Sequence, residues 1–274
     1  MKVLLFFVLF GFFTLFLFSS LPVVFSYGYL GMHNSLSSPL SFTFALTKEL
    51  FFQFVSVCSR PFFPHFISPS IHREGKLPIF LVHGYLERPS LWGWFRRALL
   101  QYEVGSIHLI ALHLPYGSLE ELALQLKRNI ARLEGKKPCI LIGHSMGGLV
   151  CSYYAECLEE GKQVEKVITI GSPFSGTLMA RFGRGNSAKQ MLPSSPFLCH
   201  LQDKLQISTR SYLYIASSQD NLIIPFSSAL GVDNPHHQNL CFPHLGHISL
   251  LFSSDIVREI AQFLLKESNL SKVN

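Results

Sequence analysis

The chain has 274 residues, of which 48% are hydrophobic and only 15% are charged, and its mean hydropathy is +0.30. An ordinary globular domain carries about 25% charged residues and disordered chains are still more polar, so this composition excludes a disordered protein or a coiled coil. The net charge of +6 comes without a block of Lys or Arg, which excludes the basic patch of a nucleic-acid-binding protein.

The N-terminal end is the apolar part, since 16 of the 25 Phe lie between Phe6 and Phe66. Residues 3–18 hold a single polar side chain, and no charged residue occurs between Lys2 and Lys48. We assign residues 1–30 to a membrane segment with two interpretations. The favoured one is an uncleaved transmembrane anchor, because an apolar run of about 20 residues spans a bilayer core. The other is a signal peptide whose cleavage would release a secreted protein.

Lys2 is the only cation near this segment. By the positive-inside rule the N-terminus is then cytoplasmic and the rest of the chain lies on the non-cytoplasmic side of the membrane. Residues 31–75 form a linker, in which a helix is predicted over residues 43–58. This helix could lie at the membrane interface or pack on the following domain, and both interpretations stay open.

From Lys76 onward, short apolar runs alternate with amphipathic stretches of helical length. This alternation predicts an α/β domain over residues 76–268, with a mostly parallel central sheet and helices on both faces. One connection, residues 172–210, is long and rich in Gly, Ser and Pro, which is typical of a cap or binding loop. The predicted strands are residues 77–83, 107–112, 139–143, 164–170, 212–216 and 238–242, and the predicted helices are residues 90–102, 118–133, 145–160 and 253–266.

The six cysteines show neither a C-x-x-C motif nor paired spacing, so we predict no metal site and no disulfide framework. One bridge, between Cys199 and Cys241, stays possible if the domain is exported. No cofactor is expected either.

Residues 143–148 read Gly-His-Ser-Met-Gly-Gly between a predicted strand and a predicted helix. This is the G-x-S-x-G nucleophile elbow, in which a sharp turn raises the serine hydroxyl above the sheet. Ser145 is therefore the candidate nucleophile. The backbone N–H groups of Tyr85, after the first strand, and of Met146, at the helix N-terminus, are the candidate oxyanion donors. His83 is interpreted as a structural brace for the Tyr85 loop.

A serine nucleophile needs a base and an acid, which in elbow enzymes follow the serine in the order acid, then histidine. His247 follows the last predicted strand in a Gly-containing loop and is the candidate base, with His244 as the alternative. Asp220 lies just past the predicted strand 212–216 and is the candidate acid. Asp203 and Asp233 are the alternative acids.

The His83-Gly84 pair, the elbow, and the Asp220 and His247 loops resemble the α/β-hydrolase superfamily, most of all bacterial triacylglycerol lipases and esterases, over about residues 77–265. The resemblance implies a Ser145–Asp220–His247 triad and hydrolysis of an ester through an acylated serine. It also implies that residues after Pro173 form a cap over an acyl pocket. The candidate pocket residues are Met191, Leu192, Phe197 and Leu198.

The sequence therefore predicts a membrane-associated serine ester hydrolase that acts on lipid or other acyl esters. An acyltransferase or thioesterase with the same triad is the alternative, and a non-catalytic membrane-tethered binding protein is a weaker one. The expected partners are the acyl-ester substrate and a membrane, and no nucleic acid. We expect activity to fall below about pH 6 as His247 becomes protonated.

Overall fold

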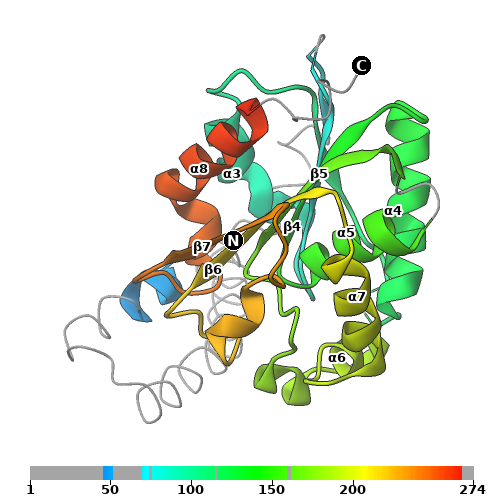
Figure 1. Ribbon diagram of the computed structural model, residues 1–274. Helices are drawn as coiled ribbons and strands as arrows, with labels where there is room; N and C mark the ends of the chain where they lie inside the picture. Colours follow the sequence, from blue (N-terminus) through cyan, green and yellow to red (C-terminus); the bar gives the residue numbers. More distant parts are fainter. Residues whose placement is uncertain (1–45, 52–69, 74–75, 115, 159–161, 267–274) are drawn as a thin grey trace, which may run out of the picture.

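The computed structural model describes residues 46–51, 70–73, 76–114, 116–158 and 162–266. A seven-stranded sheet runs through it in the order β1-β3-β2-β4-β5-β6-β7 (Figure 1). Strand β1 is antiparallel to β3 and all other neighbours are parallel, which confirms the mostly parallel sheet. The strands are β1 (Ser70–Ile71), β2 (Ile79–Val82), β3 (Ile107–Ile110), β4 (Cys139–His144), β5 (Val164–Ile170), β6 (Ser211–Ser217) and β7 (His237–Phe242).

Helices cover both faces of the sheet, as the alternation predicts (Figure 1). Successive side chains of a strand point to opposite faces, so each strand contributes to two separate cores. In β2, for example, Phe80 and Val82 pack in one core, whereas Ile79 and Leu81 pack in the other. The first core contains α4 (Leu119–Glu134), α5 (Met146–Cys157) and α7 (Pro196–Gln206), and the second contains α3 (Gly93–Leu99) and α8 (Ser254–Leu265).

Serine side chains mark the starts of several helices. The Ser118 hydroxyl accepts the N–H of Glu121, whose carboxylate accepts the N–H of Ser118 in return, so α4 begins with a capping box. Ser195 and Ser253 cap α7 and α8 in the simpler way. The predicted helix over residues 90–102 is divided into a 3-10 turn, η2 (Pro89–Trp92), followed by α3.

The long connection, residues 172–210, contains the 3-10 turn η4 (Leu178–Phe182), helix α6 (Gly185–Gln190) and helix α7. Helix α7 packs on α5, and the ring of Phe197 stacks on that of Tyr153 with centroids 5.2 Å apart. The thiols of Cys199 and Cys241 are both exposed and free, so the disulfide that the sequence left open is not formed.

Little of the region before the α/β domain belongs to the described residues. Of the helix predicted over residues 43–58, residues 46–51 are helical and the rest lies outside the description. Strand β1 comes from the predicted linker and extends the sheet by one strand. Within the described ranges no helix is long and apolar enough to cross a bilayer, and the predicted membrane segment, residues 1–30, lies outside them.

Candidate active site

Ser145 stands between β4 and α5 at the carboxyl edge of the sheet. Its backbone has a φ of 55° and a ψ of −127°, a conformation that is rare for a residue with a side chain and typical of a strained functional turn. The Ser145 N–H donates to the carbonyl of Ile170 at 2.8 Å, which ties the turn to the neighbouring strand β5. The residue is only 9% exposed.

Two glycines of the motif allow this turn to pack. A Cβ atom on Gly143 would lie 2.4 Å from the backbone nitrogen of Gly148, and a Cβ atom on Gly147 would lie 2.4 Å from the carbonyl oxygen of Val82. Both distances are far inside van der Waals contact. The elbow can therefore approach strand β2 and its own helix only with glycine at these positions.

Asp220 and His247 form a buried pair beside the elbow. Nδ1 of His247 lies 3.0 and 2.9 Å from the two carboxylate oxygens of Asp220, and both side chains are almost fully buried. The carboxylate can only accept, so Nδ1 carries a proton and Nε2 of the neutral ring is free to act as a base. Oδ1 of Asp220 also accepts the N–H groups of Leu222 and Ile223, which fixes the carboxylate.

The surroundings of His247 favour its protonated form. Burial lowers the pKa of the imidazole, but the nearby carboxylates of Asp220, Glu87 and Glu49 outweigh burial and hold this pKa above its ordinary value. The backbone N–H of His247 donates to Oδ1 of Asn221 at 2.9 Å. His247 is thus held by contacts to both its side chain and its main chain.

His83 braces the loop that carries Tyr85, as the sequence predicts. Nε2 of His83 accepts the N–H of Leu112 at 3.1 Å, so the ring proton is on Nδ1, which donates to the carbonyl of Gly84 at 2.9 Å. Burial lowers the pKa of His83, which keeps the ring neutral. Met146 is the first residue of α5, where backbone N–H groups have no acceptor within the helix.

One cavity of about 280 Å³ joins these residues. Ser145, His247 and Tyr85 line it together, and most of the other lining side chains are apolar. The apolar wall comes mainly from η4, α6 and the loop after β6: Met179, Ala180, Phe182, Ala188, Met191, Leu222 and Ile223.

The structure separates the four residues predicted to contact an acyl chain. Met191 lines the cavity. Phe197 and Leu198 pack instead in the core, because they lie on the side of α7 that packs on α5, and Leu192, which precedes α7, is partly buried against the same core. The alternatives left open for the triad, His244, Asp203 and Asp233, are exposed and lie away from the cavity lining, whereas Asp220 and His247 contact each other.

Sequence reasoning missed a second pair, Glu87 and His144, behind the triad. Nδ1 of His144 lies 2.9 Å from Oε1 of Glu87, and Nε2 lies 3.2 Å from the carbonyl oxygen of His247. Burial raises the pKa of the Glu87 carboxyl, but His144, His247 and the N–H of Gly84 together hold it below its ordinary value. The signal in the sequence that could have pointed to this pair was the position of His144 directly before Ser145.

Glu49 was missed as well. It comes from the helical residues 46–51 (blue in Figure 1), is fully buried and lines the cavity. Its neighbour Lys48 suggested only the polar face of a helix, and nothing in the sequence links Glu49 to the histidine loop.

Two groups of side chains in the described part of the chain bring possible metal ligands within 4.8 Å of one another. One is Glu87, His144 and His247, and the other is His72, His108 and Glu134. In the second group, Nε2 of His108 already contacts Glu134 at 2.8 Å and Nδ1 contacts the hydroxyl of Ser70 at 2.9 Å. In the first group, Nδ1 of His144 contacts Glu87 at 2.9 Å and Nδ1 of His247 contacts Asp220 at 2.9 Å.

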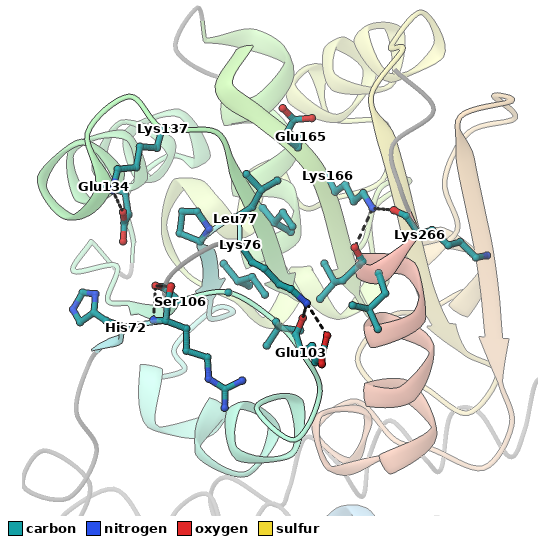
Figure 2. A pocket seen from close by; sticks show the side chains of 18 residues that line it. His72, Lys76, Leu77, Glu103, Ser106, Glu134, Lys137, Glu165, Lys166 and Lys266 are labelled. Carbon is teal, nitrogen blue, oxygen red and sulfur yellow. Dashed lines mark hydrogen bonds and ion pairs between the residues drawn. The ribbon is translucent and has the colours of Figure 1, made fainter. Parts of the chain in front are cut away.

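A larger cavity of about 810 Å³ opens at the opposite, amino ends of the parallel strands (Figure 2). Four of its charged groups form pairs: Lys76 with Glu103 at 3.3 Å and Lys137 with Glu134 at 3.1 Å. Lys166 donates to three carbonyls at the end of α8. This cavity holds none of the predicted site residues.

Comparison with known proteins bears on the family and the fold of the chain. A family model described as a thioesterase domain matches residues 77–210. No curated protein that was searched matches the chain.

Several solved structures share the fold. The mature lipase of Bacillus licheniformis is 17% identical with a TM-score of 0.58, over 71% of this chain and 94% of that one. The monoacylglycerol lipase of Paleococcus ferrophilus is 14% identical with a TM-score of 0.54, over 71% and 97%. An esterase from a Rhodococcus species is 14% identical with a TM-score of 0.56, over 73% and 94%. At these identities the likeness shows a shared fold.

Proposed function

We propose that this chain, which has the α/β-hydrolase fold, is a serine hydrolase that cleaves acyl esters through an acyl-enzyme. One observation carries the proposal: Ser145 on its strained elbow and His247, whose ring is paired with the buried Asp220, line one mostly apolar cavity. The residue types, their chain order and the cavity shared by Ser145 and His247 match the requirements of nucleophilic catalysis by serine.

In the first half of the reaction, Nε2 of His247 accepts the proton of the Ser145 hydroxyl as its oxygen attacks the ester carbonyl carbon. Asp220 holds the ring in the required tautomer and stabilises the imidazolium that forms. The negative charge that develops on the carbonyl oxygen is stabilised by the backbone N–H groups of Tyr85 and Met146. The intermediate collapses, the ester C–O bond breaks, and the imidazolium protonates the departing alcohol.

In the second half, water replaces the alcohol. His247 takes one proton from water, the resulting oxygen attacks the acyl-serine, and the same two N–H groups stabilise the second oxyanion. Collapse of this intermediate releases the carboxylic acid and returns the proton to Ser145, so the enzyme ends unchanged.

The direct test is labelling of the full chain, in detergent, with a fluorophosphonate, together with hydrolysis of p-nitrophenyl butyrate. We expect a covalent adduct on the peptide that contains Ser145 and release of p-nitrophenol. Absence of both would contradict the proposed function.

The size of the cavity predicts the acyl chains that are preferred. Its volume of about 280 Å³ lies just below the range of ligand pockets, about 300 to 1,000 Å³. A short acyl chain fits inside, whereas a long one has to continue over the rim. We expect kcat/KM for p-nitrophenyl butyrate to exceed that for the palmitate by about tenfold or more, both measured in the same detergent. Equal values for the two esters would contradict this prediction.

A thioesterase is the second candidate, and the family model over residues 77–210 favours it. The same nucleophile and base serve either reaction, and only the leaving group differs. The rates of hydrolysis of butyryl-coenzyme A and of p-nitrophenyl butyrate, measured at equal concentrations, distinguish a thioesterase from an ester hydrolase. Formation of a new ester in the presence of a competing alcohol would instead indicate an acyltransferase.

A membrane is the proposed partner. Leu86 and Phe182 line the mouth of the cavity, yet their side chains are 52% and 70% exposed, which gives the entrance an apolar rim. An apolar substrate held in a bilayer would meet this rim first. We propose that residues 3–21 anchor the enzyme, with the hydrolase domain on the non-cytoplasmic side, and that signal cleavage is the alternative. Labelling of separated membrane and soluble fractions tests this location.

The raised pKa of His247 predicts how kcat/KM depends on pH. The base must be neutral to accept the serine proton, and a higher pKa means that the ring becomes protonated at a higher pH. We therefore expect the acidic limb of kcat/KM to lie above the ordinary histidine value of about 6.5, not near the pH of about 6 that the sequence suggested. A profile of kcat/KM from about pH 5 to pH 9 measures it, and a limb below about 6 would contradict the prediction.

A further inference from the structure

Glu49 is fully buried against the histidine loop, although it comes from a segment far ahead of the hydrolase domain in the sequence. Its Oε1 accepts the N–H of Ile248 at 2.7 Å, and its Oε2 accepts the N–H of Ser249 at 3.0 Å. These are the two residues that directly follow His247. One carboxylate therefore satisfies two consecutive buried N–H groups that would otherwise lack a partner.

The contacts of Glu49 complete the support of this loop. The N–H of His247 is held by Asn221, its carbonyl by His144, and its ring by Asp220. The N–H groups of Ile248 and Ser249 are held by residues 46–51. If those two bonds are lost, the loop keeps only its internal hydrogen bonds on this side, and we expect the imidazole to be less firmly placed.

Glu49 also belongs to the charged surroundings of His247. Asp220 reaches the ring from the loop after β6, and Glu87 faces it from the loop after β2. His144 faces the ring from the end of β4, and Glu49 faces it from residues 46–51. The Glu49 charge favours the imidazolium that forms when His247 takes the serine proton. Burial, together with Asp220, outweighs the two N–H groups and His247 and holds the pKa of the Glu49 carboxyl above its ordinary value. Both of its oxygens accept N–H groups, so the ionised carboxylate is the form that fits this loop.

We propose that Glu49 is a positioning residue of the active site, which fixes the loop of His247 and stabilises its protonated ring. Residues 46–51 of the predicted linker thus complete the hydrolase site. This inference rests on the proposed function, because it assigns to His247 the role of the base.

The test compares two neighbouring variants of the full chain in detergent. Glu49→Gln removes the charge and replaces one acceptor oxygen by an amide donor, so it cannot satisfy both N–H groups. Lys48→Gln is the matched control, since it changes the charge of the adjacent residue, whose side chain is not buried. The readouts are kcat and KM for p-nitrophenyl butyrate over about pH 5 to pH 9, and the thermal unfolding midpoint.

We expect kcat of Glu49→Gln to fall between about tenfold and a hundredfold, as small displacements of a catalytic group do, with KM changed less than about twofold. Its acidic limb shifts to lower pH, because the loss of a carboxylate lowers the pKa of His247. Lys48→Gln behaves like the wild type. A purely structural role would lower the unfolding midpoint without moving the pH profile of the folded fraction.

A Glu49→Gln variant with the kcat and the acidic limb of the wild type overturns the inference. If this variant does not fold, Glu49→Asp tests the positioning role in its place, because aspartate keeps the charge on a shorter side chain. A reduced kcat with an unchanged acidic limb supports the positioning role, and an unchanged kcat overturns it. A wild type that hydrolyses no ester contradicts the proposed function instead, so the two failures are distinguishable.

Discussion

Ser145→Ala is expected to reduce kcat for p-nitrophenyl butyrate by about 10⁶-fold, the scale seen when a triad serine is removed. The variant lacks the oxygen that attacks the ester, so no acyl-enzyme can form. Labelling by a fluorophosphonate is lost at the same time. The fold should persist, because alanine keeps the Cβ atom and the elbow glycines are unchanged.

Ser172→Ala is the matched control for this substitution. Ser172 is also fully buried and packs against the elbow, where a Cβ atom on Gly148 would lie 2.1 Å from its Oγ. That Oγ has no hydrogen-bond partner among the described residues, so its removal breaks no bond there. We expect Ser172→Ala to keep both labelling and hydrolysis. Loss of label in Ser172→Ala, or its persistence in Ser145→Ala, would contradict the assignment of the nucleophile.

Asp220→Asn has the second-largest expected effect, a decrease of about 10⁴-fold in kcat. The amide can direct its N–H₂ group at Nδ1 of His247, which forces the ring proton onto Nε2. In that tautomer the base cannot accept the serine proton. The amide oxygen can still accept the N–H groups of Leu222 and Ile223, so the unfolding midpoint should change little.

Asp233→Asn is the control for the acid, because Asp233 is exposed and was an alternative from the sequence. We expect its kcat to equal that of the wild type. If Asp233→Asn or Asp203→Asn lowered kcat more than Asp220→Asn does, Asp220 would not be the acid.

The sheet and the elbow could be predicted because their signals are local. Strand β5 coincides with its predicted range, residues 164–170, since its Val and Ile residues are buried and mark the strand although Glu165 and Lys166 interrupt the apolar run. Ser145 was recognisable because the glycines around it are required by backbone contacts within a few residues or with one adjacent strand. Asp220 and His247 followed from their order after the strands. The hydrogen bonds between them place them together in space.

Other features depend on contacts that no local pattern encodes. Helix α7 was hidden in a segment rich in Gly, Ser and Pro, although Ser195 followed by Pro196 is a typical helix start. Its apolar residues Phe197 and Leu198 were assigned to a pocket because the direction of α7 could not be known. Glu87 and Glu49 lie beside the histidines only because of the tertiary fold. Their positions in the sequence therefore did not indicate that they belong to the site.

The hydrogen bond between Glu49 and Ile248 joins residues 199 positions apart, and this separation affects when the enzyme can become active. During synthesis at about 5 to 20 residues per second, Glu49 is made between about 10 and 40 seconds before its partner. Contacts of such long range form late, since a large loop must close first. The newly made chain can therefore form its elbow while the base still lacks its final support, and we expect the full rate of hydrolysis only once Glu49 has met the loop of His247.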